Sequence, residues 1–231
     1  MYEKLYNNAK SNNLNIIECA RYNFKENSGT KQGKHAKYVP CYNQVYNILH
    51  NPKSIFEGYL FPCNKLLKTS FIKENNIMFD KGRYGEDQIF TITAKVLAEK
   101  CLYIPEFLYN YRLRHDSTSH SQHPDRLMRV MQLQKLKDFL LAQNLDDNFY
   151  KFFEKQSIDS LALTYIDIPE KDKKFFDEDV KQYLSNESYK IFKKKAKKYK
   201  NIFELIFSVK NFNSTKVLTI LGFKFKLKDI A

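Results

Sequence analysis

A short, mainly apolar run near the start of the chain limits the fold more than any other feature. It contains Leu14, Ile16, Ile17, Cys19 and Ala20. A brief apolar run of this kind is typical of a strand whose two faces are both covered. The preceding segment, 1–13, has sparse apolar residues in a polar setting and predicts a short amphipathic helix. A helix followed by a buried strand predicts the mixed α/β class.

The next hundred residues continue this alternation. Residues 23–37 are polar and include two glycines, which predicts a loop or hairpin. Residues 42–50 and 64–75 are predicted to be helical. Residues 87–100 are apolar on two sides, which predicts a helix that crosses the core. Two short strands are expected over 101–104 and 108–112, interrupted by the proline between them.

The character of the chain changes after Pro124. A long helix is predicted from Leu127 to Leu141, and further helices are predicted over 147–167, 172–184 and 187–200. Residues 217–227 alternate apolar and lysine positions, which predicts a basic strand or hairpin. We therefore expect a mixed α/β part over 1–123 and a helical, lysine-rich part over 124–231.

The positive charge is concentrated in that second part. The chain has a net charge of +13, and residues 186–228 hold twelve lysines against two glutamates. Lysines next to apolar residues favour an anionic membrane surface over 190–228, although a solvated lysine-rich helix explains them equally well. Nucleic-acid binding is not expected, because the charge is localised and no accompanying RNA-binding or zinc motif is found.

An acidic pair, Glu86 and Asp87, opens the helix predicted over 87–100. Acidic residues are common at helix starts, where the backbone N–H groups favour them by about 0.3–1 kcal/mol. A carboxylate on a rigid helix end can also serve as a general base. Arg112, Arg114 and His120 follow, and cations of this kind can stabilise a leaving diphosphate.

Three motifs in order give this region a family resemblance. The first is Asn64, Lys65, Leu66 and Lys68. The second is Phe79, Gly82, Glu86, Asp87 and Phe90. The third is Tyr109, Tyr111, Arg112, Arg114, Ser117, Ser119 and Ser121. Over residues 1–125 the chain resembles the acceptor half of bacterial family 2 glycosyltransferases of surface-polysaccharide and lipopolysaccharide biosynthesis, which have the GT-A fold.

The resemblance implies roles for the residues that match. Asp87 would be the general base, with Glu86 beside it, and Arg112, Arg114 and His120 would lie near the donor diphosphate. Asn64, Lys65, Gly82, Arg83 and Tyr84 would line the acceptor pocket. Simpler explanations also exist: the two arginines can form a solvated strand face, the histidine can be an exposed loop residue, and Asn64 can cap a helix.

The family also has a D-x-D segment that holds a divalent metal, Mn or Mg, on the donor. No D-x-D segment precedes Glu86 in this chain. Met1–Lys10 resembles the helix that follows the D-x-D segment in the family. We therefore expect the nucleotide-binding half to be missing, and no metal site in this chain. Asp177 and Asp179 have the D-x-D spacing, but they are expected to form a solvated helix face.

These observations predict an inverting hexosyltransferase, or part of one, that transfers a sugar from a nucleotide-sugar donor to a cell-surface glycan or lipid-linked saccharide. Two alternatives remain: a non-catalytic partner that supplies the acceptor half, and a basic protein that binds membranes or nucleic acid. The four cysteines have no CxxC spacing and predict reduced thiols. We expect a cytoplasmic protein, peripheral on the inner face of the membrane.

Overall fold

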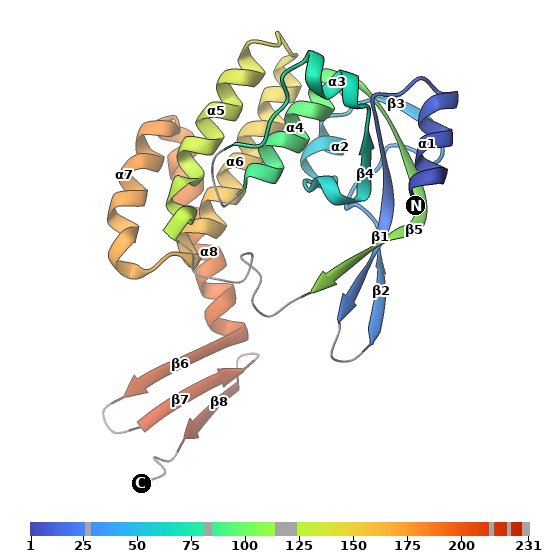
Figure 1. Ribbon diagram of the computed structural model, residues 1–231. Coiled ribbons are helices and arrows are strands. Elements are labelled where there is room, and N and C mark those ends of the chain that lie inside the picture. The colour runs from blue at the N-terminus through green and yellow to red at the C-terminus, as the bar shows by residue number, and fades with distance from the viewer. Residues whose placement is uncertain (26–28, 81–84, 114–123, 213–214, 221–222, 228–231) are drawn as a thin grey trace. The chain divides into compact units, whose positions relative to one another are not determined.

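The computed structural model describes residues 1–25, 29–80, 85–113, 124–212, 215–220 and 223–227 (Figure 1). The chain divides into two compact units, Met1–Gln156 and Ser157–Ala231, and the boundary falls inside helix α6 (Asp147–Asp167). The division predicted from composition, 1–123 and 124–231, lies earlier in the chain and stays a prediction. The two units are described separately below.

The first unit is built on a mixed sheet. Its strands are β1 (Ile16–Lys25), β2 (Thr30–Lys34), β3 (Val45–Asn47), β4 (Lys65–Leu67) and β5 (Lys100–Leu113). The order is β2-β1-β5-β3, and β4 also pairs with β1. Strands β1 and β5 are parallel, whereas the other pairs are antiparallel. The first five residues of β1 are buried, so the predicted buried strand and α/β class are confirmed.

Strand β5 is continuous, so the prediction of two strands separated at Pro105 is wrong. Cys19 of β1 pairs with Ile104, and the next residue, Ala20, pairs with Phe107. Pro105 and Glu106 therefore have no partner on β1. Proline lacks a backbone donor and is tolerated at such a bulge, where the strand continues although the ladder is interrupted.

Two predicted helices are also wrong, at least in part. Residues 42–50 contain strand β3, whose Val45 pairs with Leu102, and helix α2 (Pro52–Phe56) begins only after them. Residues 64–75 begin with the end of a 3-10 turn and strand β4, and only α3 (Thr69–Glu74) is helical. In both segments pairing with a neighbouring strand outweighs the local helical pattern.

Helices α1 (Tyr2–Ser11) and α4 (Glu86–Ala98) confirm the remaining predictions for this unit. Leu5 of α1 packs in a buried cluster with residues of β1 and β5. On α4, Phe90 and Ala94 pack against Phe71 and Ile77. Lys95 of the same helix reaches the sheet instead, so α4 is buried on two sides as predicted.

A buried ion cluster connects α4 to the sheet. Glu18 of β1 forms ion pairs with Lys65 of β4, at 3.1 Å, and Lys95 of α4, at 3.0 Å, and all three side chains are 1% exposed. The Tyr46 hydroxyl also donates a hydrogen bond to Glu18 Oε1. Burial acts to raise the pKa of Glu18, but Lys95 and Lys65 outweigh it and hold the pKa below its usual value.

The second unit contains the end of α6, then α7 (Lys173–Tyr183), α8 (Asn186–Ile206) and an antiparallel sheet. The sheet strands are β6 (Phe207–Phe212), β7 (Thr215–Ile220) and β8 (Phe223–Leu227). Phe176 of α7 and Phe192 of α8 are buried beside Tyr165 of α6. Among the residues described, no helix is long and apolar enough to cross a membrane.

Because Glu18 is the sole carboxylate paired with Lys65 and Lys95 in the described residues, its removal leaves two cations buried without compensation. For Glu18→Gln we expect the free energy of unfolding to fall by about 3–5 kcal/mol. Urea unfolding followed by circular dichroism measures the change. Glu106→Gln is the matched control, since Glu106 pairs with Lys4 at the surface and should cost less than about 1 kcal/mol. Equal losses in the two variants would contradict the role assigned to the cluster.

Candidate active site

The predicted acidic pair lies in the first turn of α4, where the backbone is set by a glycine. Gly85 precedes the helix with φ +81°, a left-handed conformation that glycine adopts without strain. Its carbonyl oxygen accepts hydrogen bonds from the N–H groups of Gln88, at 3.1 Å, and Ile89, at 3.3 Å. Glu86 and Asp87 are both half-buried, so two carboxylates lie together at the positive end of a helix.

Helix α5 (Arg129–Leu141) closes one side of this turn. Arg129 is buried and donates a hydrogen bond from Nη2 to Gln88 Oε1 at 2.7 Å. A β-carbon added at Gly85 would lie 2.7 Å from Gln132 Oε1 and 2.8 Å from Arg129 Nη1. A side chain at position 85 would therefore require the ends of the Arg129 and Gln132 side chains to move.

The environment makes Asp87 a stronger base than an ordinary aspartate. Burial raises its pKa, and the neighbouring charge of Glu86 raises it further. Arg129 acts in the opposite direction, by favouring the carboxylate. A carboxylate with a raised pKa accepts a proton more readily, which is the property required of a general base.

Sequence reasoning missed Arg129 and Gln132. The signal was present, because these two polar residues are spaced by three in a helix that otherwise buries leucines such as Leu133 and Leu136. Residues spaced by three lie on the same helix face. A cation on a buried face indicates a nearby carboxylate or polar partner, and here it lies at the start of α4.

The donor-side cations are only partly within the described structure. Arg112 is exposed near the end of β5. Arg114 and His120 lie outside the described residues, as do Gly82, Arg83 and Tyr84 of the predicted acceptor pocket. The roles of these residues stay predictions.

Asn64 and Lys65 are buried and hold the chain where it enters β4. Asn64 Nδ2 donates to the Cys19 carbonyl at 2.5 Å. Lys65 Nζ donates to the carbonyls of Tyr59 and Phe61, at 3.0 and 2.8 Å, and to Asn64 Oδ1 at 2.9 Å. These hydrogen bonds stabilise the fold around β4. The predicted place of Asn64 and Lys65 in the acceptor pocket stays a prediction.

No metal centre is formed by the residues that the structure describes. Nowhere among them do three His, Cys, Asp or Glu side chains converge, and Glu86 and Asp87 have no third ligand of these types. The described donor set therefore does not fit the divalent ion expected for the complete family enzyme, and no chemical step is assigned to it below.

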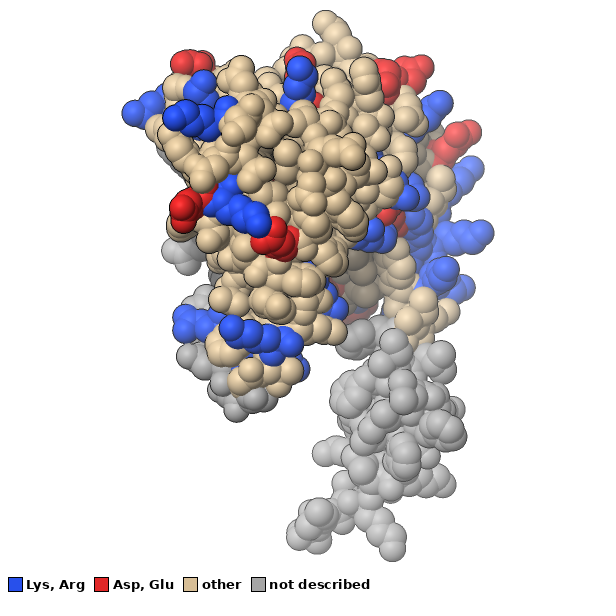
Figure 2. Space-filling model, turned by 90° about the vertical axis from the view of Figure 1, so that its right-hand side faces the viewer, with Lys and Arg blue, Asp and Glu red and all other residues tan. Residues whose placement is uncertain are grey.

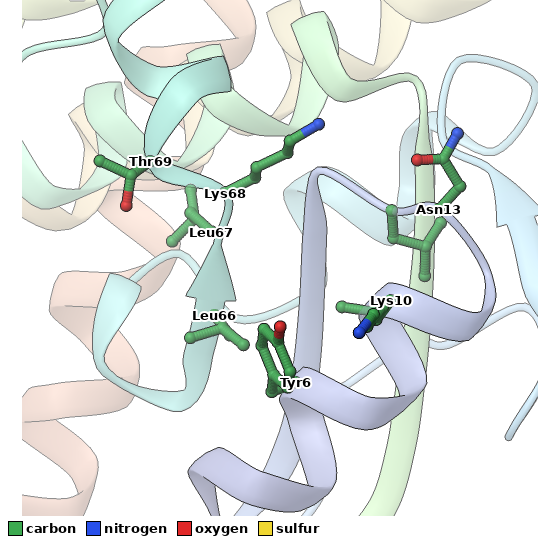
Figure 3. A pocket seen from close by; sticks show the side chains of 9 residues that line it. Tyr6, Lys10, Asn13, Leu66, Leu67, Lys68 and Thr69 are labelled. Atoms are coloured by element: carbon green, nitrogen blue, oxygen red, sulfur yellow. The ribbon is translucent and has the colours of Figure 1, made fainter.

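A separate pocket lies between α1 and the β4–α3 segment (Figure 3). Its volume is about 450 Å³. It is lined by Tyr6, Ala9, Lys10, Asn13, Leu14, Leu66, Leu67, Lys68 and Thr69. Tyr6 faces Leu66 across it (Figure 3). None of the predicted catalytic or diphosphate residues lines this pocket.

Surface charge on the face shown in Figure 2 is mixed in sign. Blue and red side chains are interspersed with uncharged ones over the described part of this face. Surface ion pairs among the described residues include Lys4 with Glu106 and Lys37 with Glu57. The electrostatic character of this face is therefore that of an ordinary protein surface.

Comparison with known proteins places the fold. No protein-family model matches the chain, and no curated protein matches it. One similar structure is a crystal structure of residues 1–349 of TarS from S. aureus, which is a glycosyltransferase. The alignment covers 100% of this chain and 70% of the TarS chain, with a TM-score of 0.50 and 11% sequence identity. A second TarS structure, in complex with UDP, has TM-score 0.39 and 11% identity over 99% of this chain and 70% of its own. The first likeness shows a mixed α/β fold of the GT-A-like glycosyltransferase type.

Gly85→Ala tests the close approach of α5. Alanine at φ +81° is strained by about 1–2 kcal/mol, and the ends of the Arg129 and Gln132 side chains must also move away from the added β-carbon, which adds to the loss. Thermal unfolding should show both effects. Gly29→Ala is the matched control, because Gly29 also has positive φ, +62°, but its added β-carbon has no neighbour within 4 Å. Equal destabilisation of the two variants would refute the close contact.

Proposed function

We propose that the chain carries the acceptor-activating site of an inverting glycosyltransferase, with Asp87 as its general base. The observation that carries the proposal is the raised pKa of a carboxylate placed at a helix start in a glycosyltransferase-like fold. The donor is a nucleotide sugar, and the acceptor is a cell-surface glycan or a lipid-linked saccharide.

In this mechanism Asp87 accepts the proton of an acceptor hydroxyl. The acceptor oxygen then forms a bond to the anomeric carbon from the face opposite the leaving group, which inverts the configuration. The bond between the anomeric carbon and the nucleoside diphosphate breaks, and its electron pair leaves with the diphosphate. Developing charge on the diphosphate is stabilised by cations, the role proposed for Arg112, Arg114 and His120.

The neighbours of Asp87 have distinct parts. Glu86 keeps the pKa of Asp87 high by charge repulsion, and Arg129 limits that rise while its hydrogen bond to Gln88 orients the first turn. Gly82, Arg83 and Tyr84 precede this turn directly, and together with Asn64 and Lys65 they are proposed to shape the acceptor pocket. A divalent metal is the cofactor expected for the complete family enzyme, where it would neutralise charge on the donor diphosphate.

Asp87→Asn should abolish donor-dependent sugar transfer, since an amide cannot accept the proton. A loss of at least 100-fold in kcat is expected, which is the usual order of magnitude for a general base. Release of nucleoside diphosphate during turnover measures it. Asp80→Asn is the control: Asp80 pairs with Lys135 and has no proposed role in the reaction. An Asp87→Asn protein with the parent rate would refute the assignment.

The pH profile gives a second readout of the same assignment. The base must be deprotonated, so activity falls as pH drops through the pKa of Asp87. Arg129 lowers that pKa, and its replacement by glutamine should therefore move the acid limb of kcat/KM to higher pH. An unchanged acid limb would show that the titrating base is another group.

We further propose that α8 contacts an anionic membrane through its lysines. Phe192 and Ala196 are buried within the unit, whereas Ile191 and Ile202 of the same helix are exposed. Lys193 and Lys195 pair with Asp177 and Asp159. The other lysines of the helix are exposed and have no ion pair among the described residues: Lys190, Lys194, Lys197, Lys198 and Lys200. These lysines provide an electrostatic attraction between α8 and anionic lipid.

Replacing Lys190, Lys194 and Lys197 together with glutamine should weaken sedimentation with phosphatidylserine vesicles. Each lysine contributes about 1 kcal/mol near such a surface, so the partition coefficient should fall on the order of 100-fold. The control replaces Lys171, Lys174 and Lys181, exposed lysines of the same unit, and removes the same charge. Equal losses in both triple variants would show that net charge, not this helix face, is responsible.

A further inference from the structure

Arg21 on β1 lies against three aromatic rings. Its Cζ atom is 4.3 Å from the ring centroid of Tyr111, 4.4 Å from that of Phe61 and 5.2 Å from that of Tyr59. These rings come from β5 and from the segment that leads into β4. A guanidinium in such contact is held in place by cation–π attraction.

The three rings adjoin one another along the guanidinium. The centroids of Phe61 and Tyr111 are 5.5 Å apart, and those of Tyr59 and Phe61 are 4.9 Å apart. Phe61 therefore connects Tyr59 and Tyr111 into one continuous aromatic wall beside the Arg21 cation.

Arg21 has no anionic partner among the described residues. Its guanidinium lies against the three rings, and its Nε atom is buried without a hydrogen-bond acceptor. Lys65 gives an informative contrast, because its Nζ atom lies 5.4 Å from the Phe61 ring centroid and also pairs with Glu18. Glu18 therefore compensates the charge of Lys65, whereas the charge of Arg21 has no carboxylate partner in the described part of the chain.

The surroundings strengthen the positive potential. Glu18 is the sole carboxylate for both Lys65 and Lys95 within the described part of the chain, so the buried cluster itself has a surplus cation. Arg21 adds another, and its charge acts on nearby groups by lowering the pKa values of Tyr59 and Cys63 against the larger effect of burial. A partly buried region with unbalanced positive charge attracts a multiply charged anion.

We propose that Arg21 is a phosphate-binding residue, oriented for this purpose by Tyr59, Phe61 and Tyr111. The planar guanidinium offers a fork of donors that matches phosphate oxygens, and the aromatic wall fixes the plane of that fork. A phosphate is a better ligand here than a carboxylate because the Glu18 cluster and Arg21 together have more than one uncompensated positive charge. Binding at Arg21 needs no sugar transfer, so the inference is independent of the role of Asp87.

Titration calorimetry of the full chain at low salt tests the proposal, with UDP, inorganic pyrophosphate and inorganic phosphate as probes. Arg21→Gln should weaken binding of at least one probe by tenfold or more. Arg21→Lys should recover only part of the loss, because lysine keeps the charge without the fork. Lys31→Gln is the matched control, since Lys31 lies 5.9 Å from the Tyr22 and Phe24 ring centroids on the neighbouring strand but is exposed, and it should change affinity less than twofold.

The probes distinguish the sources of the phosphate. Equal losses for UDP and pyrophosphate support a nucleotide diphosphate, and a loss confined to inorganic phosphate supports a phosphorylated acceptor. Binding of no probe to the parent, unchanged affinity in Arg21→Gln, or an equal loss in Lys31→Gln would overturn the proposal. Circular dichroism of both Arg21 variants identifies misfolding. If Arg21→Gln fails to fold, the affinity of Arg21→Lys for the probes decides whether the proposal holds. Asp87→Asn should bind each probe as the parent does, which keeps this result separate from the assignment of the base.

Discussion

The Glu18 ion cluster is the interaction on which the arrangement of the first unit depends. It joins three elements that are far apart in sequence: β1 through Glu18, β4 through Lys65 and α4 through Lys95. A buried carboxylate is tolerated only when its partners are in place, so the cluster disfavours any packing that separates α4 from the sheet. Hydrophobic contacts of α4 set its depth in the core, whereas the ion pairs also fix its rotation about its own axis.

This constraint explains how an acidic pair can be held at a helix start. Lys95 anchors the later part of α4 to the sheet, and Arg129 holds the first turn through Gln88. Gly85 leaves room for the Arg129 side chain beside this turn. Two acids that repel each other are therefore fixed in a half-buried position, and the cost appears as a raised pKa at Asp87. Ion pairs formed elsewhere in the fold thus support the property that a general base needs.

The sequence predicted the elements that depend on local pattern. Strand β1, the two-sided α4 and the helices after Pro124 follow from apolar spacing, which the neighbours do not alter. It failed at residues 42–50 and at 64–67, where short strands are selected by pairing with β5 and β1. It also missed Glu18, Lys95 and Arg129, because each looks like an ordinary polar residue until its distant partner is known. The positions of Glu86 and Asp87 at the start of α4 were predicted correctly, whereas the α5 cation that limits the rise in the pKa of Asp87 was not.

The distribution of positive charge shows why burial matters more than number. The exposed lysines of α8 are numerous, but water screens each of them, and their combined effect depends on a charged surface nearby. Lys65, Lys95 and Arg21 are few and lie in or beside the core of the sheet, where burial lowers the pKa of Lys65 to about 8 although Glu18 favours its charged form. A cation that stays charged despite such burial exerts a stronger force on an approaching anion than one in water. We therefore expect ligand recognition by this fold to depend on the cations beside β1, and the lysines of α8 to govern association with surfaces.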